Sequence, residues 1–247
     1  MATTVDIVTR NFFRMMRSGA LNEYVELEPM SDFKWQRLVE TVCSENVASV
    51  ASRAVKNHQF EQKFNMPQTL RDEIHRAASA NTGQSIHPEL DNPMLNKKLN
   101  RIYMLEKHSE NCSKESLELF NILIANCHAI LNEGTSTRLI IRLGNHIRIN
   151  GASIDYDKVE RWLKELQMQE VAQLAGSILI NNFAFKKEEL PFVRKIDSKA
   201  ATVMVQSIMQ RRKAKHNKGI TYFTYAPLEN ASIIIGRLKK QLGTIEE

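Results

Sequence analysis

Long apolar runs are missing from this 247-residue sequence, and cysteine, glycine and proline are few. No stretch approaches about 18 consecutive apolar residues, so we expect no transmembrane helix. The opening residues, MATTVDIVTRNFF, place an acid and a base too early for the apolar part of a signal peptide, so none is expected. These absences predict a soluble, cytoplasmic protein without a membrane role.

Cysteine is equally scarce, with only Cys43, Cys112 and Cys127 in the chain. An odd count without close pairs argues against a disulfide framework and fits a reducing compartment. His108 lies four residues before Cys112, and His128 follows Cys127, but no CxxC or HxxxH spacing occurs. Because zinc sites depend on such spacing, we expect no metal, and nothing indicates another cofactor.

Recognisable catalytic motifs are missing too. The sequence contains no GxGxxG, no GxxxxGK[ST] and no GxSxG, so it shows no phosphate-binding loop and no nucleophile elbow. We therefore assign no catalytic residue. Glycine and proline number only nine and six, and long alternating β-branched runs are absent, which argues against a β architecture.

What the sequence does contain is helical periodicity. Apolar residues recur at spacings of three and four along most of the chain, and 43% of its residues are hydrophobic. We expect an all-α protein, an orthogonal bundle of about eleven helices. The most loop-like stretch, 79–92, predicts an N-terminal lobe over 1–80 and a C-terminal lobe over 92–247, unless the two form a single domain.

Several residues mark helix ends. Gly19 is placed to end a first helix that runs from Val5 to Arg17. Pro93 and Pro227 suit first helical positions, where a missing N–H costs nothing. Caps at helix N-termini are expected at Ser31, Ser113, Ser136, Asp155 and Asp197.

The densest apolar content lies in residues 152–193. Two stretches of helical spacing, separated by a short break, predict a helical hairpin on which neighbouring helices dock. Asp155 and Asp157 at its start form the only Asp-x-Asp, a spacing with which two carboxylates can hold one Mg²⁺. Aspartate also caps helix N-termini and suits the helix dipole there, and we favour this explanation.

Positive charge is concentrated at the C-terminal end. Residues 194–247 carry eleven Lys and Arg against four Asp and Glu, whereas the preceding 193 residues have a net charge of −1. Cations contact phosphates and aromatic rings stack on single-stranded bases, so this segment is the candidate binding region. A solvated helix end would explain the same basic run. The candidate residues are Arg211, Arg212, Lys213, Lys215, Lys218, Tyr222 and Tyr225.

Two parts of the chain resemble a known family. The segments FFRMMRSGAL and YDKVERWLKELQMQEVAQLAGSILINNFAFKKEELPF, within 10–57 and 152–193, are similar to helical parts of a bacterial family described as uncharacterised nucleotidyltransferases. In that family the catalytic domain lies between these parts and carries a Gly-Ser pair followed by an Asp-x-Asp on a strand. Here the only Gly-Ser is Gly176-Ser177, inside the apolar hairpin, so no catalytic residue carries over.

The resemblance implies a bacterial-type helical frame without its active domain. We expect a non-catalytic binding or scaffold protein, whose basic C-terminal segment serves a protein partner or nucleic acid. The alternative is a divergent Mg²⁺-dependent nucleotidyltransferase-like enzyme that uses Asp155 and Asp157. The sequence leaves the oligomeric state and the identity of any partner open.

Overall fold

The computed structural model describes residues 6–80, 89–210 and 225–243, with side chains as far as Gly236 in the last range. Over these residues the chain forms eleven α-helices, two short 3₁₀ helices and no strand. The prediction of an all-α fold with about eleven helices is therefore confirmed. The chain divides into two compact units, Met1–Ser85 and Ile86–Glu247, which we call unit 1 and unit 2.

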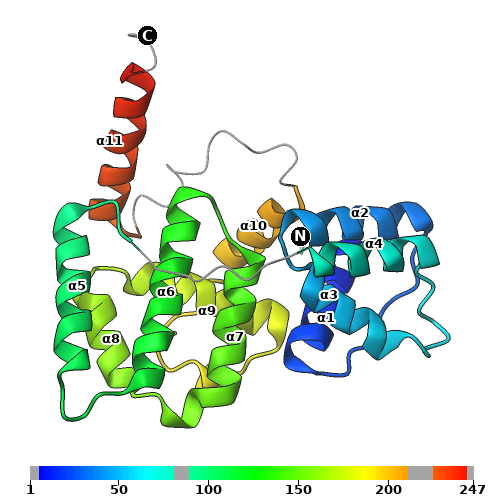
Figure 1. Cartoon of the computed structure of the whole chain (residues 1–247), viewed down its shortest axis with the longest axis horizontal. Coiled ribbons are helices and arrows are strands. Elements are labelled where there is room, and N and C mark those ends of the chain that lie inside the picture. The colour runs from blue at the N-terminus through cyan, green and yellow to red at the C-terminus, as the bar shows by residue number, and fades with distance from the viewer. Residues whose placement is uncertain (1–5, 81–88, 211–224, 244–247) are drawn as a thin grey trace. The chain divides into compact units, whose positions relative to one another are not determined.

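Unit 1 contains four described helices around an apolar core (Figure 1). They are α1 (Ile7–Leu21), α2 (Asp32–Ser44), α3 (Ala48–His58) and α4 (Gln68–Ser79). α1 and α4 both pack on α3, and α2 packs on α1 and α4. Phe12, Met15 and Trp35 are among the largest fully buried side chains in this core.

Gly19 does not end α1, and our prediction for it was wrong. The helix continues to Leu21 and ends at Asn22, which has a left-handed φ of 54°. Gly19 is instead the point where α1 meets α3, because a Cβ there would overlap the carbonyl oxygen of Val50. Arg53 Nε also donates to the Gly19 carbonyl oxygen at 2.8 Å. The glycine is required for close packing of two helices and not for a turn.

Two asparagines hold the extended segment between α1 and α2. Asn11 donates from Nδ2 to the carbonyl of Glu28 and accepts the Glu28 N–H at Oδ1, at 2.7 and 3.0 Å. Asn65 binds both backbone groups of Met30 in the same way, and its Oδ1 also accepts from Trp35 Nε1 at 2.9 Å. Each amide thus pairs with a backbone N–H and C=O that no helix satisfies.

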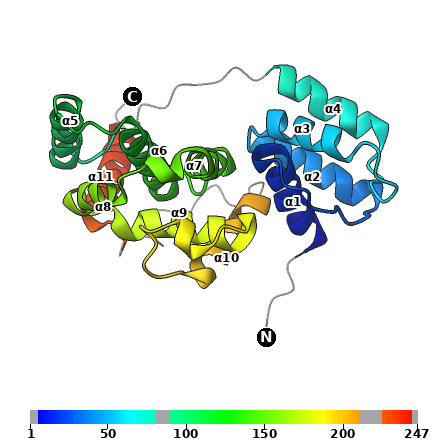
Figure 2. The same ribbon diagram turned by 90° about the horizontal axis from the view of Figure 1, so that it is seen from below.

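Unit 2 is organised around the helix α9. Its described elements are α5 (Pro93–Lys107), α6 (Lys114–Asn132), α7 (Thr137–Asn150), η1 (Gly151–Ser153), α8 (Tyr156–Glu165), α9 (Gln169–Phe183), η2 (Lys187–Glu189), α10 (Ser198–Met209) and α11 (Pro227–Gly243). α9 lies between α10 on one side and α6 and α7 on the other (Figure 2). Most of its residues are buried, so the expectation that neighbouring helices dock on this apolar stretch is confirmed.

Most of the predicted helix starts are also confirmed. The side chains of Ser113, Asp155 and Asp197 accept backbone N–H groups of α6, α8 and α10. Ser31 and Ser136 occupy the capping positions of α2 and α7, but their side chains make no capping hydrogen bond. Helices α5 and α11 begin at Pro93 and Pro227, as the missing N–H of proline allows.

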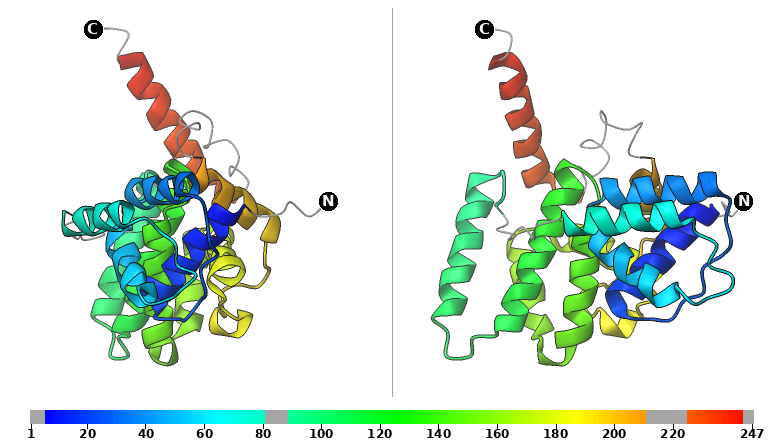
Figure 3. Two further views of the ribbon diagram at one scale, coloured as in Figure 1. Left: turned by 90° about the vertical axis from the view of Figure 1, so that its right-hand side faces the viewer. Right: turned by 45° about the vertical axis from the view of Figure 1, so that its right-hand side comes forward.

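Helix α11 is attached to the rest of unit 2 through its first two turns. Glu229, Asn230 and Ile233 are buried, whereas Ile235 and Gly236 are exposed. Figure 3 shows α11 meeting the neighbouring helices at its N-terminal end. α11 is therefore attached through a short stretch of side chains at its N-terminal end.

Candidate functional site

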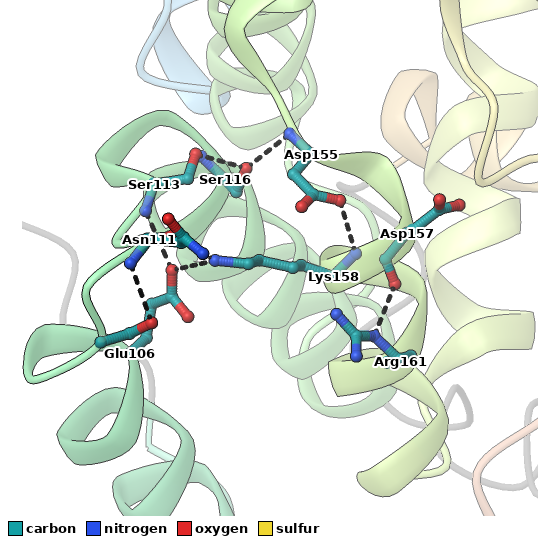
Figure 4. A network of polar contacts seen from close by, with 9 residues as sticks. Glu106, Asn111, Ser113, Ser116, Asp155, Asp157, Lys158 and Arg161 are labelled. Atoms are coloured by element: carbon teal, nitrogen blue, oxygen red, sulfur yellow. Dashed lines mark hydrogen bonds and ion pairs between the residues drawn. The ribbon is translucent and has the colours of Figure 1, made fainter.

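The two carboxylates of the Asp-x-Asp do not converge. Asp155 Oδ1 accepts the Lys158 N–H at 3.0 Å, and the Asp155 N–H donates to Ser116 Oγ at 2.7 Å. In Figure 4 the Asp157 carboxylate points away from Asp155. The first aspartate therefore caps α8, which confirms the favoured explanation, and the pair offers no joint ligand set for one ion.

A buried ion pair lies beside this cap and ties three helices together. Lys158 Nζ on α8 is 2.8 Å from Glu106 Oε1 at the end of α5, and both side chains are largely buried. Glu106 Oε1 also accepts the N–H of Ser113, at the start of α6, at 2.9 Å. Lys158 donates in addition to the Asn111 carbonyl (Figure 4). Each charge thus has several partners, as burial demands.

No local sequence pattern predicts this ion pair. Glu106 and Lys158 are 52 residues apart, and each reads as an ordinary charge on its own helix. A weak signal was the position of Glu106, which continues the apolar spacing of Leu95, Leu99 and Ile102 on the buried face of α5. A charged residue in a buried register needs a partner, but the sequence does not identify it.

The cysteine and histidine pairs do not assemble into a metal centre. Cys127 is fully buried, its Sγ lies 3.9 Å from the Met168 carbonyl oxygen, and burial raises the pKa of its thiol. His128 Nε2 lies 3.4 Å from Asp91 Oδ2, while His108 contacts the carbonyl of its own helix. Within the described ranges, no group of three His, Cys, Asp or Glu side chains is placed to hold a metal ion.

A reciprocal set of caps joins the starts of α5 and α11. The Glu229 carboxylate, fully buried in the first turn of α11, accepts the N–H groups of Asp91 and Asn92 at 2.5 and 2.9 Å. Asn92 caps α5 with its own Oδ1 and donates from Nδ2 to Ser232 Oγ on α11. Burial raises the pKa of Glu229, although its two N–H partners lower it. Our sequence reading missed the role of Glu229.

Most of the candidate binding residues lie outside the described residues. This holds for Arg211, Arg212, Lys213, Lys215, Lys218 and Tyr222. Tyr225 is described, and its hydroxyl donates to Asp197 Oδ2 at 3.3 Å. Burial and the nearby Asp197 charge raise the Tyr225 pKa. Asp197 also caps α10 and Tyr225 stands just before α11, so this contact joins the starts of the two helices that flank the basic segment.

A shallow pocket in unit 1 has its charges already paired. It encloses about 320 Å³ beside the extended segment, and its lining includes Arg14 and Lys63. Arg14 lies 2.7 Å from Glu28, and Lys63 lies 2.7 Å from Glu26. Because both cations are paired with neighbouring carboxylates, neither is left to bind an anionic ligand in this pocket.

Comparisons with known proteins leave the family open. No protein-family model, no curated protein and no solved structure matches this chain. The resemblance to the nucleotidyltransferase family thus stays a prediction. Among the described residues, no helix is long and apolar enough to cross a membrane.

Proposed function

We propose that this chain is a non-catalytic helical binding protein whose basic C-terminal segment contacts the phosphates of a nucleic acid. The observation that carries the proposal is the separation of charge along the sequence. Residues 194–247 have a net charge of +7, and the remaining 193 residues have a net charge of −1. A cluster of cations in an otherwise neutral chain is the electrostatic pattern of a nucleic-acid site.

The described residues on either side of the basic segment support this proposal. The segment follows the end of α10 at Met209 and precedes Tyr225, whose hydroxyl binds Asp197. Glu229 lies four residues further on, in the first turn of α11. Its side chain is buried and accepts the N–H of Asn92, just before α5. The described residues on both sides of the basic segment thus belong to packed parts of unit 2.

Tyr222 and Tyr225 have different roles in this proposal. The hydroxyl of Tyr225 is bonded to Asp197 and its side chain is half-buried, so Tyr225 fixes the end of the segment. Tyr222 is then the residue that stacks on a base, next to the cations that contact phosphates. We therefore expect Tyr222→Ala to weaken binding of single-stranded RNA more than binding of heparin, which has no bases.

The test is binding of heparin and single-stranded RNA across a salt series. The variant changes Arg211, Arg212, Lys213 and Lys215 to Glu. The slope of log affinity against log salt is about −0.7 per phosphate contacted in single-stranded RNA, so four lost contacts should reduce its magnitude by about 3.

A matched control changes four exposed cations elsewhere in unit 2 to Glu: Lys97, Arg101, Lys107 and Lys187. The formal net charge falls equally in both variants, so only the position of the charges differs. We expect the control to keep most of the salt slope. Equal losses in the two variants, or an affinity that ignores salt in the wild type, would contradict the proposal and direct attention to a protein partner.

The enzymatic alternative has less support. Asp155 is used as the cap of α8, and Asp157 points away from it (Figure 4). Mg²⁺-dependent nucleotidyl transfer needs at least two carboxylates on one ion, and these two carboxylates do not converge.

A further inference from the structure

Helix α5 buries one side against unit 2 and exposes the other. Leu95, Leu99 and Ile102 are buried and form its attached side. Met104 and Leu105, in contrast, expose 59% and 62% of their surface. Figures 1 and 2 show α5 at the edge of unit 2. The exposed side of this helix is therefore a surface of unit 2 that a partner can reach.

This exposed side combines apolar and basic residues, and we call it the α5 outer face. At 3.6 residues per turn, six exposed positions fall within about a third of the helix circumference, opposite the buried positions. They are Met94, Lys97, Arg101, Met104, Leu105 and His108. Neither Lys97 nor Arg101 has a side-chain hydrogen bond or ion pair with another described residue. Both cations are thus available to an external anion.

The α5 outer face carries no negative charge of its own. The only carboxylate of α5 is Glu106, which lies on the buried side and pairs with Lys158 on α8. Lys98 borders the face, and its Nζ lies 3.4 Å from the carbonyl oxygen of Glu165. Cations and apolar side chains therefore share one surface of α5 without an acid between them. A complementary partner must offer negative charge together with an apolar layer.

We infer that the α5 outer face binds the surface of an anionic phospholipid bilayer, with α5 lying in the plane of the interface. Met94, Met104 and Leu105 enter the boundary between the headgroups and the acyl chains. Lys97 and Arg101 lay their apolar stems along this boundary, and their charged ends reach the lipid phosphates. Each kind of side chain on the face then has a matching layer in the membrane surface.

This inference differs from our expectation of no membrane role. That expectation rested on the absence of an apolar run long enough to span a bilayer. A helix in the interface stays on one side of the membrane and inserts only its exposed side chains, so it needs no such run. With 15 residues, α5 is too short to span the bilayer and long enough to lie on it.

Two other classes of partner fit the α5 outer face less well. A partner helix packs on apolar residues at spacings of three and four, but Lys97 and Arg101 interrupt that series here. A nucleic acid would contact the cations and leave Met104 and Leu105 exposed. Tyr103, the one aromatic residue of α5, has a buried hydroxyl and lies outside the face, so it offers no stacking platform there.

The test is sedimentation of the full chain with vesicles, either of phosphatidylcholine alone or with about one third phosphatidylserine. The wild type should bind the anionic vesicles and leave the neutral ones unbound. Changing both Lys97 and Arg101 to Gln should lower the partition coefficient about 30-fold, because each cation near such a surface contributes a factor of about five. Leu105→Gln keeps every charge and should lower it about fivefold by removing an inserted side chain.

A matched control changes Lys187 and Lys199 to Gln. Both residues are exposed, on η2 and α10, and the net charge falls as much as in the α5 double variant. The control should bind within about twofold of the wild type, since its charges lie outside the contact and are screened by salt. Circular dichroism should show unchanged helical content in every variant, because each changed side chain is exposed.

Several outcomes would overturn the inference, and none of them depends on RNA binding. A wild type that does not bind anionic vesicles would do so, as would equal losses in the control and in the α5 double variant. Vesicle binding that survives the α5 changes and is lost when Arg211, Arg212, Lys213 and Lys215 become Glu would belong to the basic C-terminal segment. Equally tight binding to soluble polyglutamate, unaffected by Leu105→Gln, would identify an acidic protein as the partner instead.

Discussion

The side chain that a position tolerates depends on the atoms packed around it, and Gly19 is the clearest case. An alanine Cβ at this position would overlap the carbonyl oxygen of Val50 in the facing helix. Backbone cannot move aside as a flexible side chain can, so we expect Gly19→Ala to destabilise unit 1 by about 2 to 3 kcal/mol. Urea unfolding followed by circular dichroism measures the change.

Gly236 provides the control, because an added Cβ there meets nothing within 4 Å. Gly236→Ala should leave stability unchanged or raise it by up to about 1 kcal/mol, since alanine favours helix more than glycine does. If Gly19→Ala proved as harmless as Gly236→Ala, the close contact between α1 and α3 would be wrong.

The buried carboxyl of Glu229 predicts that the attachment of α11 depends on pH. Burial raises its pKa, so the folded state binds a proton at this site more tightly than the unfolded state does. This group therefore stabilises the fold more at low pH, and the gain is lost as pH rises through the folded pKa. We expect the stability of the wild type relative to Glu229→Gln to increase as pH falls toward the pKa of the unfolded carboxyl, about 4.3.

Thermal unfolding of both variants at several pH values tests this expectation. Asp91 and His128 lie close to Glu229 and act on its pKa in opposite directions. His128→Gln in both backgrounds removes the effect of the histidine on the pKa of the Glu229 carboxyl. A stability difference that does not change with pH would show that Glu229 keeps an ordinary pKa.

At the scale of helices, the start of α8 tests whether the Asp-x-Asp is structural. Asp155→Ala removes a side chain that accepts the Lys158 N–H, and should cost about 1 kcal/mol. Asp157→Ala removes only a favourable charge in the first turn, for about 0.5 kcal/mol. A wild-type melting temperature raised by millimolar Mg²⁺, and no longer raised in either variant, would instead support a metal site.

The pair formed by Glu106 and Lys158 couples α5, α6 and α8. Removing one partner leaves a largely buried charge unpaired, so Lys158→Met and Glu106→Leu should each cost about 3 kcal/mol. The double variant should cost less than the sum, by about 1 to 3 kcal/mol, because no lone charge remains. Strictly additive losses in urea unfolding would mean that the two charges do not interact.

At the scale of the whole molecule, the two units differ in charge. Residues 1–85 carry ten Lys and Arg and ten Asp and Glu, so unit 1 has no net charge. Unit 1 also has its own core, built from α1 to α4. We expect a fragment of residues 1–85 to unfold cooperatively and to bind neither heparin nor single-stranded RNA. A fragment of residues 86–247 should keep the full salt slope, and strong RNA binding by 1–85 would contradict this division of roles.

The sequence by itself determined the helical elements, because the signals for them are local. Helical spacing of apolar residues and the caps at Ser113, Asp155 and Asp197 depend on neighbours three or four positions away. Because this capping signal is local, Asp155 could be predicted as a cap from the sequence. It also made Gly19 misleading, since a glycine near a helix end reads as a stop unless the helix facing it is known.

Only the tertiary structure decided which distant residues meet. Three sets of contacts join positions 35 to 138 residues apart. They are the ion pair of Glu106 with Lys158, the hydrogen bonds of the Asn65 side chain to Met30, and the hydrogen bonds that Glu229 accepts from Asp91 and Asn92. No periodicity encodes such contacts, because they depend on how helices cross in space. The physical reason is that buried polar groups must find partners wherever the packing of the apolar faces brings them, and that packing is a property of the folded chain.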